Sequence, residues 1–363
     1  MKIALIGTRG IPAQYGGFET CAEELSQRLV KKGHEVWVYG RSGYYKKKLK
    51  EYGGVKLVYL PELKVKALDT LSHTFFSLLH GLPKNYDIIL VFNYANSPLL
   101  MLPKLMGKNV ILHVDGLEWG REKWKGFGKK YYKFAEWLST KLSIDLISDS
   151  KSIQRYFKEK YGKKAHFVSY GADLQFSRDI YLLERFNLKP QEYFLQITRF
   201  EPENNPLLSI EAFQRMETNK YLVLVGGVQY RTEYSEKIFS IKDPRIKLLG
   251  FVYDKKILQD LLCNCYAYIH GNEVGGTNPA LLQAMASGCF VICRDVPFNR
   301  EVLQNAGIYF QKSVDDLFEK LSWSLQNYNQ IKKKGEEGRK IIKDDYSWEK
   351  VVDKYLEIFS LFV

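Results

Sequence analysis

The sequence lacks several features that would assign it to a special class of protein. No uninterrupted run approaches the roughly 18 apolar residues of a membrane-spanning helix. The first apolar stretch is too short for a signal peptide and ends in a glycine loop, so we interpret it as a strand. The five cysteines are odd in number and fit no zinc site. These absences predict a cytoplasmic protein with buried thiols.

The charge balance is strongly basic. Fifty-four Lys and Arg residues face 41 Asp and Glu residues, which gives a formal net charge of +13. Such a surplus favours a polyanionic partner, and nucleic acid, anionic lipid headgroups and phosphorylated substrates all qualify. No stretch resembles a nucleic-acid-binding module, so we expect no nucleic-acid partner.

Short apolar runs alternate with helix-length amphipathic segments over the 363 residues. This pattern is typical of α/β proteins with parallel sheets, and two series of runs predict two doubly wound, Rossmann-like domains facing a central cleft. We expect one domain at 1–170, joined by a C-terminal helix at 346–363, and the other at 171–345. The expected strands lie at 2–7, 34–40, 55–60, 87–93, 109–114, 146–150 and 166–170, then at 193–198, 221–225, 246–249, 265–270, 290–294 and 307–311.

A long glycine loop follows the first strand. It contains Arg9 and ends in Gly16 and Gly17, directly before an amphipathic helix that Gly33 closes. Amides at a helix N-terminus favour phosphate, and glycines let it approach the backbone. The loop matches neither a Walker motif nor the dinucleotide signature. The alternative is that its glycines only serve the geometry of a turn.

Polar residues also leave the end of the expected strand at 109–114. His113 and Asp115 are suited to acid–base chemistry at a cleft. The alternative is structural, with His113 bonded to a backbone carbonyl and Asp115 capping a turn. Lysines then interleave with aromatic residues, a composition that suits a membrane interface, although a solvated helix face would also explain it. The predicted acceptor and membrane residues are Glu118, Trp119, Lys123, Trp124, Lys129 and Lys130.

The second half contains a further predicted anion site. Arg199 follows the strand at 193–198 and could grip a diphosphate with parallel hydrogen bonds. After the strand at 265–270, Asn278 is a good N-cap, Pro279 takes the first helical position and Gly288 closes the helix. Gly275, Gly276 and Thr277 line up before this helix start. Alternatively, they form a turn alone.

Motifs along the whole chain resemble family-4 glycosyltransferases. The matching stretches are 16–17 with the following helix, 32–36, 198–204, 249–254, 282–288 and 345–348. The stretches 7–12, 113–119 and 270–279 resemble the bacterial rhamnosyltransferase branch, which builds cell-surface polysaccharides.

This resemblance implies a GT-B fold, a retaining mechanism and no metal cofactor. It also implies dTDP-β-L-rhamnose as the donor and a polyprenyl-diphosphate-linked saccharide as the acceptor, at the anionic inner face of the cell membrane. The sequence agrees in having no Asp-x-Asp triplet, the usual carboxylate pair for a metal-bound nucleotide. Arg199, the amides of 275–278 and Arg9 would meet the leaving-group charge.

Two departures from the family pattern affect the donor site. The family carries two glutamates with seven residues between them, and the aligned positions are Gly275 and Gln283. Glu273 lies two residues earlier and is the candidate to replace the first glutamate. The family's diphosphate lysine aligns with Asn204. The predicted catalytic residues are therefore Asp115, His113 and Glu273.

Three other functions stay open at this point. A UDP- or GDP-sugar could replace the dTDP donor. A non-hydrolysing nucleotide-sugar epimerase would use paired α/β domains without an acceptor. A basic membrane adaptor would bind polyanions and no nucleotide.

Overall fold

The computed structural model describes residues 1–14, 16–65, 68–114, 116–120, 126–177, 179–228 and 230–363. These residues form two compact units. Unit 1 comprises Met1–Tyr170 together with Trp348–Val363, and unit 2 comprises Gly171–Ser347. The division lies at 170/171 and 347/348, and the sequence analysis places it at 170/171 and 345/346.

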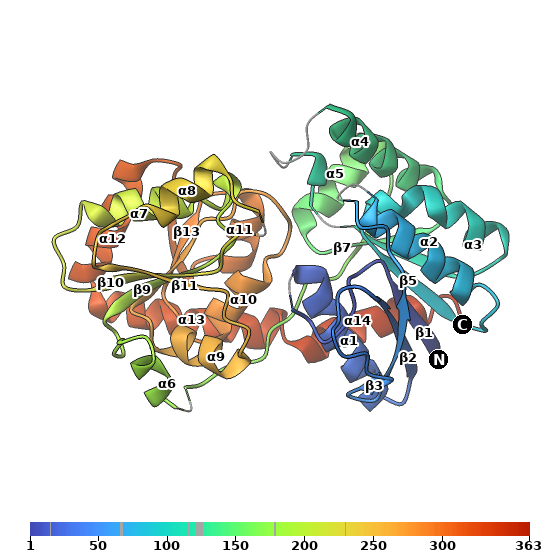
Figure 1. Cartoon of the computed structure of the whole chain (residues 1–363), viewed down its shortest axis with the longest axis horizontal. Coiled ribbons are helices and arrows are strands. Elements are labelled where there is room, and N and C mark those ends of the chain that lie inside the picture. Colours follow the sequence, from blue (N-terminus) through green and yellow to red (C-terminus); the bar gives the residue numbers. More distant parts are fainter. Residues whose placement is uncertain (15, 66–67, 115, 121–125, 178, 229) are drawn as a thin grey trace. The chain divides into compact units, whose positions relative to one another are not determined.

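Unit 1 is built on an eight-stranded sheet in the order β3-β4-β2-β1-β5-β6-β7-β8, in which only β3 is antiparallel to its neighbour. Helices α1 and α14 cover one face, and α2, α3, α4 and α5 cover the other (Figure 1). The strands are β1 (Lys2–Ile6), β2 (Glu35–Arg41), β3 (Glu51–Tyr52), β4 (Val55–Leu60), β5 (Ile88–Phe92), β6 (Val110–Val114), β7 (Asp145–Ser148) and β8 (His166–Phe167). The helices are α1 (Gly17–Lys31), α2 (Asp69–Gly81), η1 (Tyr94–Leu100), α3 (Met101–Leu105), η2 (Glu118–Gly120), α4 (Gly126–Lys141), α5 (Lys151–Tyr161) and α14 (Trp348–Phe359).

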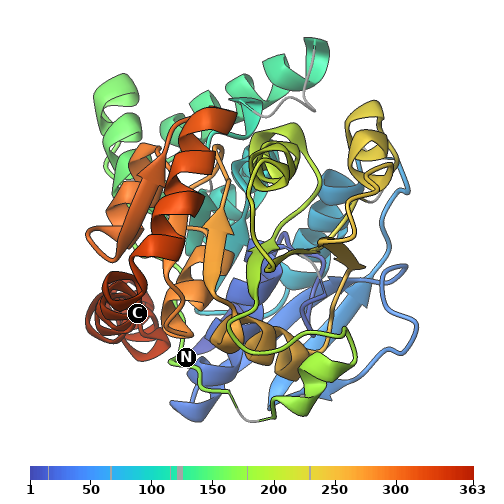
Figure 2. The ribbon, with the colours of Figure 1, turned by 90° about the vertical axis from the view of Figure 1, so that its left-hand side faces the viewer.

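Unit 2 is built on a six-stranded parallel sheet in the order β11-β10-β9-β12-β13-β14. Helices α7, α8 and α12 lie on one face and α9, α10 and α13 on the other (Figures 1 and 2). The strands are β9 (Tyr193–Ile197), β10 (Tyr221–Val225), β11 (Ile246–Gly250), β12 (Ala267–His270), β13 (Val291–Arg294) and β14 (Gly307–Phe310). The helices are α6 (Tyr181–Glu184), η3 (Pro202–Asn204), α7 (Pro206–Gln214), α8 (Glu233–Phe239), α9 (Lys255–Asn264), α10 (Pro279–Ala286), α11 (Pro297–Leu303), α12 (Val314–Gln326) and α13 (Tyr328–Asp345).

The predicted α/β architecture is confirmed. Each expected apolar run contains a strand, and central strands such as β5 and β6 are buried along their whole length. Continuous burial is what helices on both faces of a parallel sheet require. Strand β3 is not among the predicted strands, because two residues carry no periodic signal. Within the described residues, no helix is both long and apolar enough to cross a bilayer.

Two helix ends follow the glycine pattern predicted from the sequence. Gly33 after α1 has a φ of 88°, and Gly288 after α10 has a φ of 77°, in the left-handed region that glycine adopts without strain. The Gly288 amide donates to the Met285 carbonyl at 3.0 Å. The next amide, of Cys289, donates to the Ala284 carbonyl at 3.0 Å, which completes a Schellman motif. These helix ends fix where α1 and α10 stop.

Candidate functional site

The candidate site of unit 2 lies at the switch point of its sheet. From β9, the chain first builds outward through β10 and β11, then returns to place β12 on the other side of β9. In open α/β sheets, ligands bind beyond the carboxyl ends of the strands at such a point. The loops that follow β9 and β12 contain Arg199 and Gly275–Asn278, so the fold brings the two predicted anion-binding segments to one place.

Hydrogen bonds hold these two loops together. The Asn205 side chain donates to the Gly271 carbonyl at 2.8 Å, and the Glu273 amide donates to the Glu203 carbonyl at 2.9 Å. A Cβ on Gly271 would collide with the carbonyl oxygen of Asn204. Asn205 itself has a φ of 55° and is 3% exposed. The sequence analysis missed Asn205, although an Asn-Pro pair at a helix start is a signal for a turn.

Arg199 is a partly exposed cation without a counterion. Its guanidinium makes no hydrogen bond or ion pair with any described residue, while its carbonyl accepts from the Glu201 amide at 2.8 Å and from the Asn204 side chain at 3.1 Å. The loop therefore fixes the backbone and leaves the charged group available. A planar fork in this position suits a phosphate group.

The segment before α10 supplies uncommitted amides. Asn278 is the N-cap, and its side chain accepts from the Ala280 amide at 2.9 Å, as predicted. The backbone amides of Gly275, Gly276 and Asn278 make no hydrogen bond to another described residue. Gly275 has a φ of 141°, and nothing lies within 4 Å of the place where its Cβ would be. The segment thus combines helix-start amides with open space for an anion.

Glu273 lies beside these amides but is already paired. Its carboxylate accepts from the Arg294 guanidinium at 2.8 Å and from the Lys312 ammonium at 2.7 Å. Burial alone would raise the pKa of Glu273, but the hydrogen bonds to Lys312 and Arg294 outweigh it and lower that pKa below its ordinary value. Glu273 is therefore a fixed carboxylate, and Arg294 and Lys312 are residues that the sequence analysis missed.

The two substituted family positions differ in their surroundings. Asn204 is 1% exposed, and its side-chain amide is bonded to the Arg199 carbonyl, which indicates that it shapes the loop rather than contacting a diphosphate. Gln283 is half-buried, and its side chain has no hydrogen-bond partner among the described residues. Thr277 is buried next to the N-cap.

A stacked aromatic pair follows β11 at the same edge of the sheet. Phe251 and Tyr253 are 38% and 66% exposed, and their rings stack with centroids 6.0 Å apart and an interplanar angle of 18°. A Cβ on Gly227, in the loop after β10, would lie 3.1 Å from the Phe251 ring. The sequence predicts this stretch only as a family motif and not as an aromatic platform, because neighbouring aromatic residues are common in cores as well.

The glycine loop of unit 1 has a different electrostatic character. Glu19, in the first turn of α1, accepts from the Arg9 amide at 3.0 Å, and Glu23 accepts from the Ala13 amide. A Cβ on Gly16 would collide with the Glu19 carboxylate. The Arg9 guanidinium lies 5.8 Å from the ring centre of Tyr44. Acidic groups of the helix therefore occupy the place that we predict for a phosphate near Gly16 and Gly17.

His113 is placed inside unit 1 rather than at its surface. It is 0% exposed and stacks on Phe92 and Tyr170, with ring centroids 5.3 and 5.8 Å away. Burial lowers the pKa of His113 to about 3, so the ring is neutral at pH 7. Neither ring nitrogen has a side-chain or backbone partner of ordinary geometry among the described residues. This placement does not support direct proton transfer to or from an acceptor.

The other predicted residues of this region are placed in part. Asp115, Lys123 and Trp124 lie outside the described residues. Glu118 is predicted to be an acceptor and membrane residue, but it is buried, with 7% exposed. Its amide donates to the hydroxyl of the buried Tyr94 at 2.9 Å. Its side chain therefore does not belong to an exposed membrane surface.

Trp119 is anchored to a buried carboxylate. Its indole nitrogen donates to Glu136 at 2.7 Å, and Glu136 is 0% exposed. Two tyrosine hydroxyls, of Tyr156 and Tyr161, donate to the same carboxylate at 2.8 and 2.6 Å, and Lys160 lies 3.1 Å away. A buried charge needs such a set of donors. The predicted acceptor residue Trp119 is therefore held by α4 and α5.

Lys129 and Lys130 are exposed on α4, beside exposed apolar residues. Helices α2, α3 and α4 all pack on η1. Their exposed large apolar side chains and those of the adjoining turn, here called the apolar surface, are Phe75, Phe76, Leu79, Met101, Leu102, Leu105, Met106, Phe127, Phe134 and Trp137. The most exposed are Leu105 and Phe127, each at 83%. Lys104, Lys133 and Lys141 are exposed on the same helices, and Glu136 is the one acid in α3 and α4 as described.

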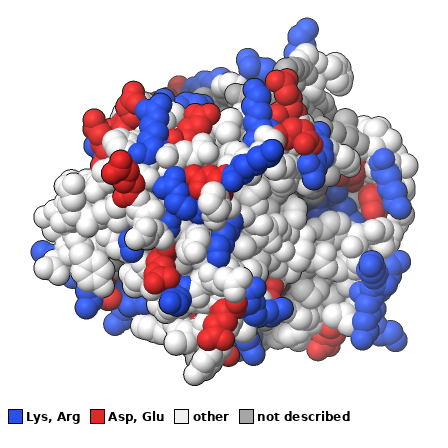
Figure 3. Space-filling model, turned by 60° about the vertical axis from the view of Figure 1, so that its left-hand side comes forward, with Lys and Arg blue, Asp and Glu red and all other residues white. Residues whose placement is uncertain are grey.

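Elsewhere the charges are mixed. Figure 3 shows acidic side chains scattered among basic ones on the face that it draws. Within the described residues, no group of three or more His, Cys, Asp or Glu side chains is placed to hold a metal ion.

Solved structures with the same architecture identify the fold as GT-B. Sucrose-phosphate synthase from Thermosynechococcus elongatus has a TM-score of 0.82 at 15% identity, covering 99% of this chain and 98% of that one. HepE from Anabaena, in complex with UDP and glucose, has a TM-score of 0.81 at 15% identity, covering 99% and 100%. WaaG, a glycosyltransferase involved in lipopolysaccharide biosynthesis, has a TM-score of 0.75 at 17% identity, covering 97% and 98%. The predicted fold class is thus confirmed, and likeness at these identities shows the fold alone.

Sequence comparisons find family matches for parts of the chain. Residues 183–341 match the family described as Glycosyl transferases group 1, and residues 90–173 match a domain of unknown function, DUF1972. The capsular polysaccharide biosynthesis glycosyltransferase CapH of Staphylococcus aureus is 28% identical over 36% of this chain and 36% of its own length. An uncharacterized protein in the cps region of Klebsiella pneumoniae is 38% identical over 17% of this chain and 16% of its own length. The chain therefore matches less than half of either curated relative.

Proposed function

We propose that this chain is a glycosyltransferase that moves a sugar from a nucleotide-sugar donor to a saccharide acceptor in polysaccharide biosynthesis. The observation that carries this proposal is the unpaired Arg199 beside the free amides of Gly275, Gly276 and Asn278, at the switch point of unit 2. The match of residues 183–341 to the Glycosyl transferases group 1 family and the similarity to CapH support it.

The donor is dTDP-β-L-rhamnose, and transfer proceeds with retention and without a metal ion. This part of the proposal rests on the resemblance to the rhamnosyltransferase branch. As the bond between C1 and the diphosphate oxygen breaks, Arg199 and the amides meet the charge of the departing diphosphate. The acceptor hydroxyl oxygen attacks C1 from the same face within an ion pair, and Asp115 takes its proton. Glu273 holds hydroxyls of the transferred sugar.

The nucleobase stacks on the pair formed by Phe251 and Tyr253. Both rings are exposed at the carboxyl end of β11, and β10 separates β11 from β9, which the loop with Arg199 follows. Stacking of a base on an aromatic side chain contributes about 1–3 kcal/mol and tolerates any base. The pair accordingly contributes to the affinity for the nucleotide, and other residues determine which base is bound.

The acceptor is a polyprenyl-diphosphate-linked saccharide at the inner face of the cell membrane. The apolar surface and its lysines support this, because exposed aromatic and aliphatic side chains with basic neighbours favour an anionic bilayer. Each lysine near such a bilayer contributes about 1 kcal/mol of attraction. The chain then acts as a peripheral membrane protein in the cytoplasm.

A melting-temperature screen with nucleotides tests the donor site. The wild-type chain is heated with dTDP, UDP, GDP and their sugars, with and without Mg²⁺. A ligand at 100 times its dissociation constant adds about 2.7 kcal/mol of stability. A shift with dTDP-rhamnose alone, equal with and without Mg²⁺, is the expected result. A larger shift with UDP-glucose, a ligand named for HepE, would replace the donor. No shift with any nucleotide would overturn the glycosyltransferase proposal and favour the adaptor.

Product analysis separates the transferase from an epimerase. With dTDP-rhamnose and no acceptor, a transferase leaves the sugar configuration unchanged, whereas an epimerase inverts one carbon. Recovery of an epimerised sugar would overturn the proposal.

Sedimentation with vesicles tests the membrane surface. The double variant Lys129→Gln with Lys130→Gln removes two charges of α4 that lie beside the apolar surface. The matched control, Lys332→Gln with Lys333→Gln, removes two exposed charges from α13 in unit 2. With vesicles that contain anionic lipid, the first pair is expected to bind at least about tenfold more weakly, and the control as wild type. Equal loss in both pairs would mean a non-specific charge effect and would contradict the assigned surface.

A further inference from the structure

The amino-terminal edge of the unit 1 sheet holds a pocket that the proposed reaction does not use. Its volume is about 310 Å³, and its lining residues are Lys2, Trp37, Val58, His80, Lys84, Asn85 and Tyr86. Lys2 begins β1, residues 84–86 lie in the loop before β5, and His80 lies in the last turn of α2. The loops of the candidate site follow the carboxyl ends of strands, so this pocket belongs to the opposite edge.

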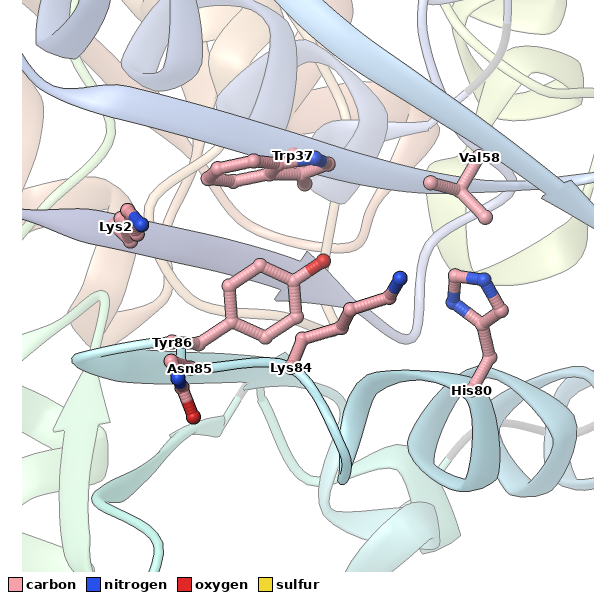
Figure 4. A pocket seen from close by; sticks show the side chains of 7 residues that line it. All are labelled: Lys2, Trp37, Val58, His80, Lys84, Asn85 and Tyr86. Carbon is pink, nitrogen blue, oxygen red and sulfur yellow. The ribbon is translucent and has the colours of Figure 1, made fainter.

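We propose that this pocket binds an anionic monosaccharide unit, one that carries a carboxylate or a phosphate. No acidic residue lines it, while Lys2 and Lys84 supply two ammonium groups. Figure 4 shows the Lys84 side chain extending between Tyr86 and His80. The Lys84 ammonium has no hydrogen-bond or ion-pair partner among the described residues, and neither has the Asn85 side chain. Charge complementarity therefore selects an anion.

Aromatic rings provide the remainder of the site. The Trp37 and Tyr86 rings lie 5.1 Å apart at 60° and form one end of the pocket (Figure 4). Lys56, paired with Glu35 at 2.8 Å, lies 4.4 Å from the Trp37 ring centre and supports it from the neighbouring strand. Binding pockets combine such apolar walls with a few polar groups. A pocket of this volume lies at the low end for small-molecule sites, which fits a single charged sugar ring and not a nucleotide sugar.

Buried hydrogen bonds hold the walls in place. The hydroxyl of Tyr39, from β2, lies 3.0 Å from the Tyr86 hydroxyl and 3.1 Å from His80 Nδ1. Tyr39 is 0% exposed, and burial raises its pKa, so it stays a neutral hydroxyl that bridges both walls. Tyr86, in the loop before β5, and the helix residue His80 are thus fixed before any ligand arrives, which lowers the ordering cost of binding.

Titration by saturation-transfer NMR tests the inference on the whole chain. The probes are glucuronic acid, glucose 1-phosphate and glucose, and inorganic phosphate is added as a competitor whose binding is measured by the loss of their signals. Both anionic sugars are expected to bind at least about tenfold more tightly than glucose, and a preference between them identifies the charged group. Lys84→Gln is expected to weaken their binding about tenfold, and Lys47→Gln, an exposed lysine outside the pocket, to leave it unchanged.

Glucose 1-phosphate also resembles part of a nucleotide sugar, so the titration is repeated with Arg199→Gln. Retained binding in that variant and loss in Lys84→Gln assigns the signal to the pocket. Loss in Arg199→Gln with no effect of Lys84→Gln would overturn the inference and leave the proposed function intact. If inorganic phosphate bound as tightly as the anionic sugars, the pocket would bind an adventitious ion only, and the inference would be overturned. Unchanged melting temperatures of the variants show that each one is folded.

Discussion

The two units share one sheet order around their first strand but differ in the loops at the strand ends. In unit 2, the loops after β9 and β12 leave Arg199 and three backbone amides without partners among the described residues. In unit 1, two amides of the glycine loop after β1, those of Arg9 and Ala13, donate to Glu19 and Glu23 of the adjoining helix. The same topology thus leaves a candidate anion site in one unit and carboxylates in the corresponding loop of the other.

This difference shows that glycines at a helix start do not define a phosphate site by themselves. The amides must also be unbonded, and no unpaired carboxylate must stand near the start of the helix. In unit 1, Glu19 stands in the first turn of α1 beside Gly16 and accepts from the Arg9 amide. In unit 2, the first turn of α10 contains no acid, and the nearby Glu273 is paired with Arg294 and Lys312. The local charge of the first helical turn decides the outcome.

Removal of the Arg199 charge is expected to have the largest effect. Arg199→Gln should lower the rate of sugar transfer by about 10²–10³, because one charge stabiliser at a departing group contributes that much. Arg185→Gln, an exposed arginine of the same unit, is the control and should keep wild-type rates. The measurement is turnover at saturating donor with melting temperatures alongside. If Arg199→Gln kept a transfer rate within a few-fold of wild type, unit 2 would not be distinguished from unit 1 by a functional anion site.

Acid should weaken both units through buried histidines, such as His113 in unit 1 and His270 in unit 2. Burial lowers the pKa of His113 in unit 1 and of His270 in unit 2 to about 3, from an ordinary value of 6.5. Between these values the unfolded chain binds a proton that the folded chain does not. As the pH drops below 6.5, each of these histidines should therefore lower the free energy of unfolding by about 1.4 kcal/mol for every pH unit.

His113→Phe and His270→Phe test this unit by unit. Each variant should show a shallower loss of stability in denaturant titrations between pH 6.5 and pH 5 than wild type does. Because His113 is buried, His113→Phe should also keep sugar transfer within a few-fold of wild type. An unchanged slope, or a large loss of transfer, would refute the assignment.

A side chain at Gly275 should weaken the anion site without a clash. Gly275→Ala has open space around the new Cβ, but the φ of 141° disfavours any L-residue there. The loop must shift, and about tenfold weaker nucleotide binding is expected, equivalent to about 1.4 kcal/mol. Calorimetric titration with dTDP-rhamnose measures it. Gly107→Ala, with a φ of 68° and nothing nearby, is the control in unit 1 and should leave binding unchanged.

The smallest expected effect concerns the acid that satisfies the loop of unit 1. Glu19→Gln keeps an acceptor for the Arg9 amide but removes its charge, which should cost about 1 kcal/mol of stability. In an Arg199→Gln background, the same change should raise the affinity of the chain for pyrophosphate. Glu24→Gln, on the same helix, is the control. No gain in affinity would show that the carboxylate is not the feature that separates the two loops.

Most of the fold could be predicted from periodicity. Buried parallel strands are continuous apolar runs, and helix ends such as Gly33 and Gly288 obey a local rule that needs no tertiary information. The two-residue strand β3 could not be predicted, because its pairing depends on a turn at Gly53 and Gly54 and not on its own sequence.

The sequence predicts those residues of the candidate site whose role depends only on their own position in the chain. Arg199 and the N-cap Asn278 were assigned from their places after a strand and before a helix. The interaction partners of these residues could not be predicted. Glu273 pairs with Lys312 and Arg294 only because these side chains meet in the folded chain. The same holds for the contact of Glu19 with the glycine loop. His113 shows the limit most clearly, since the end of a strand can lie under aromatic rings as readily as beside a cleft.

The return of the chain to unit 1 through α14 bears on the order in which the molecule folds. Lys32 pairs with Asp353 at 2.8 Å, and Cys21 contacts Tyr355, across more than 300 intervening residues. Unit 2 is continuous in sequence, so during synthesis it can close as soon as residue 347 has left the ribosome. Unit 1 is discontinuous, so the part of α1 that contacts α14, including Cys21, stays uncovered until residues 348–359 have been made, although α1 also packs on β2. Chaperones that recognise exposed apolar surface would therefore meet this part of unit 1 until α14 docks.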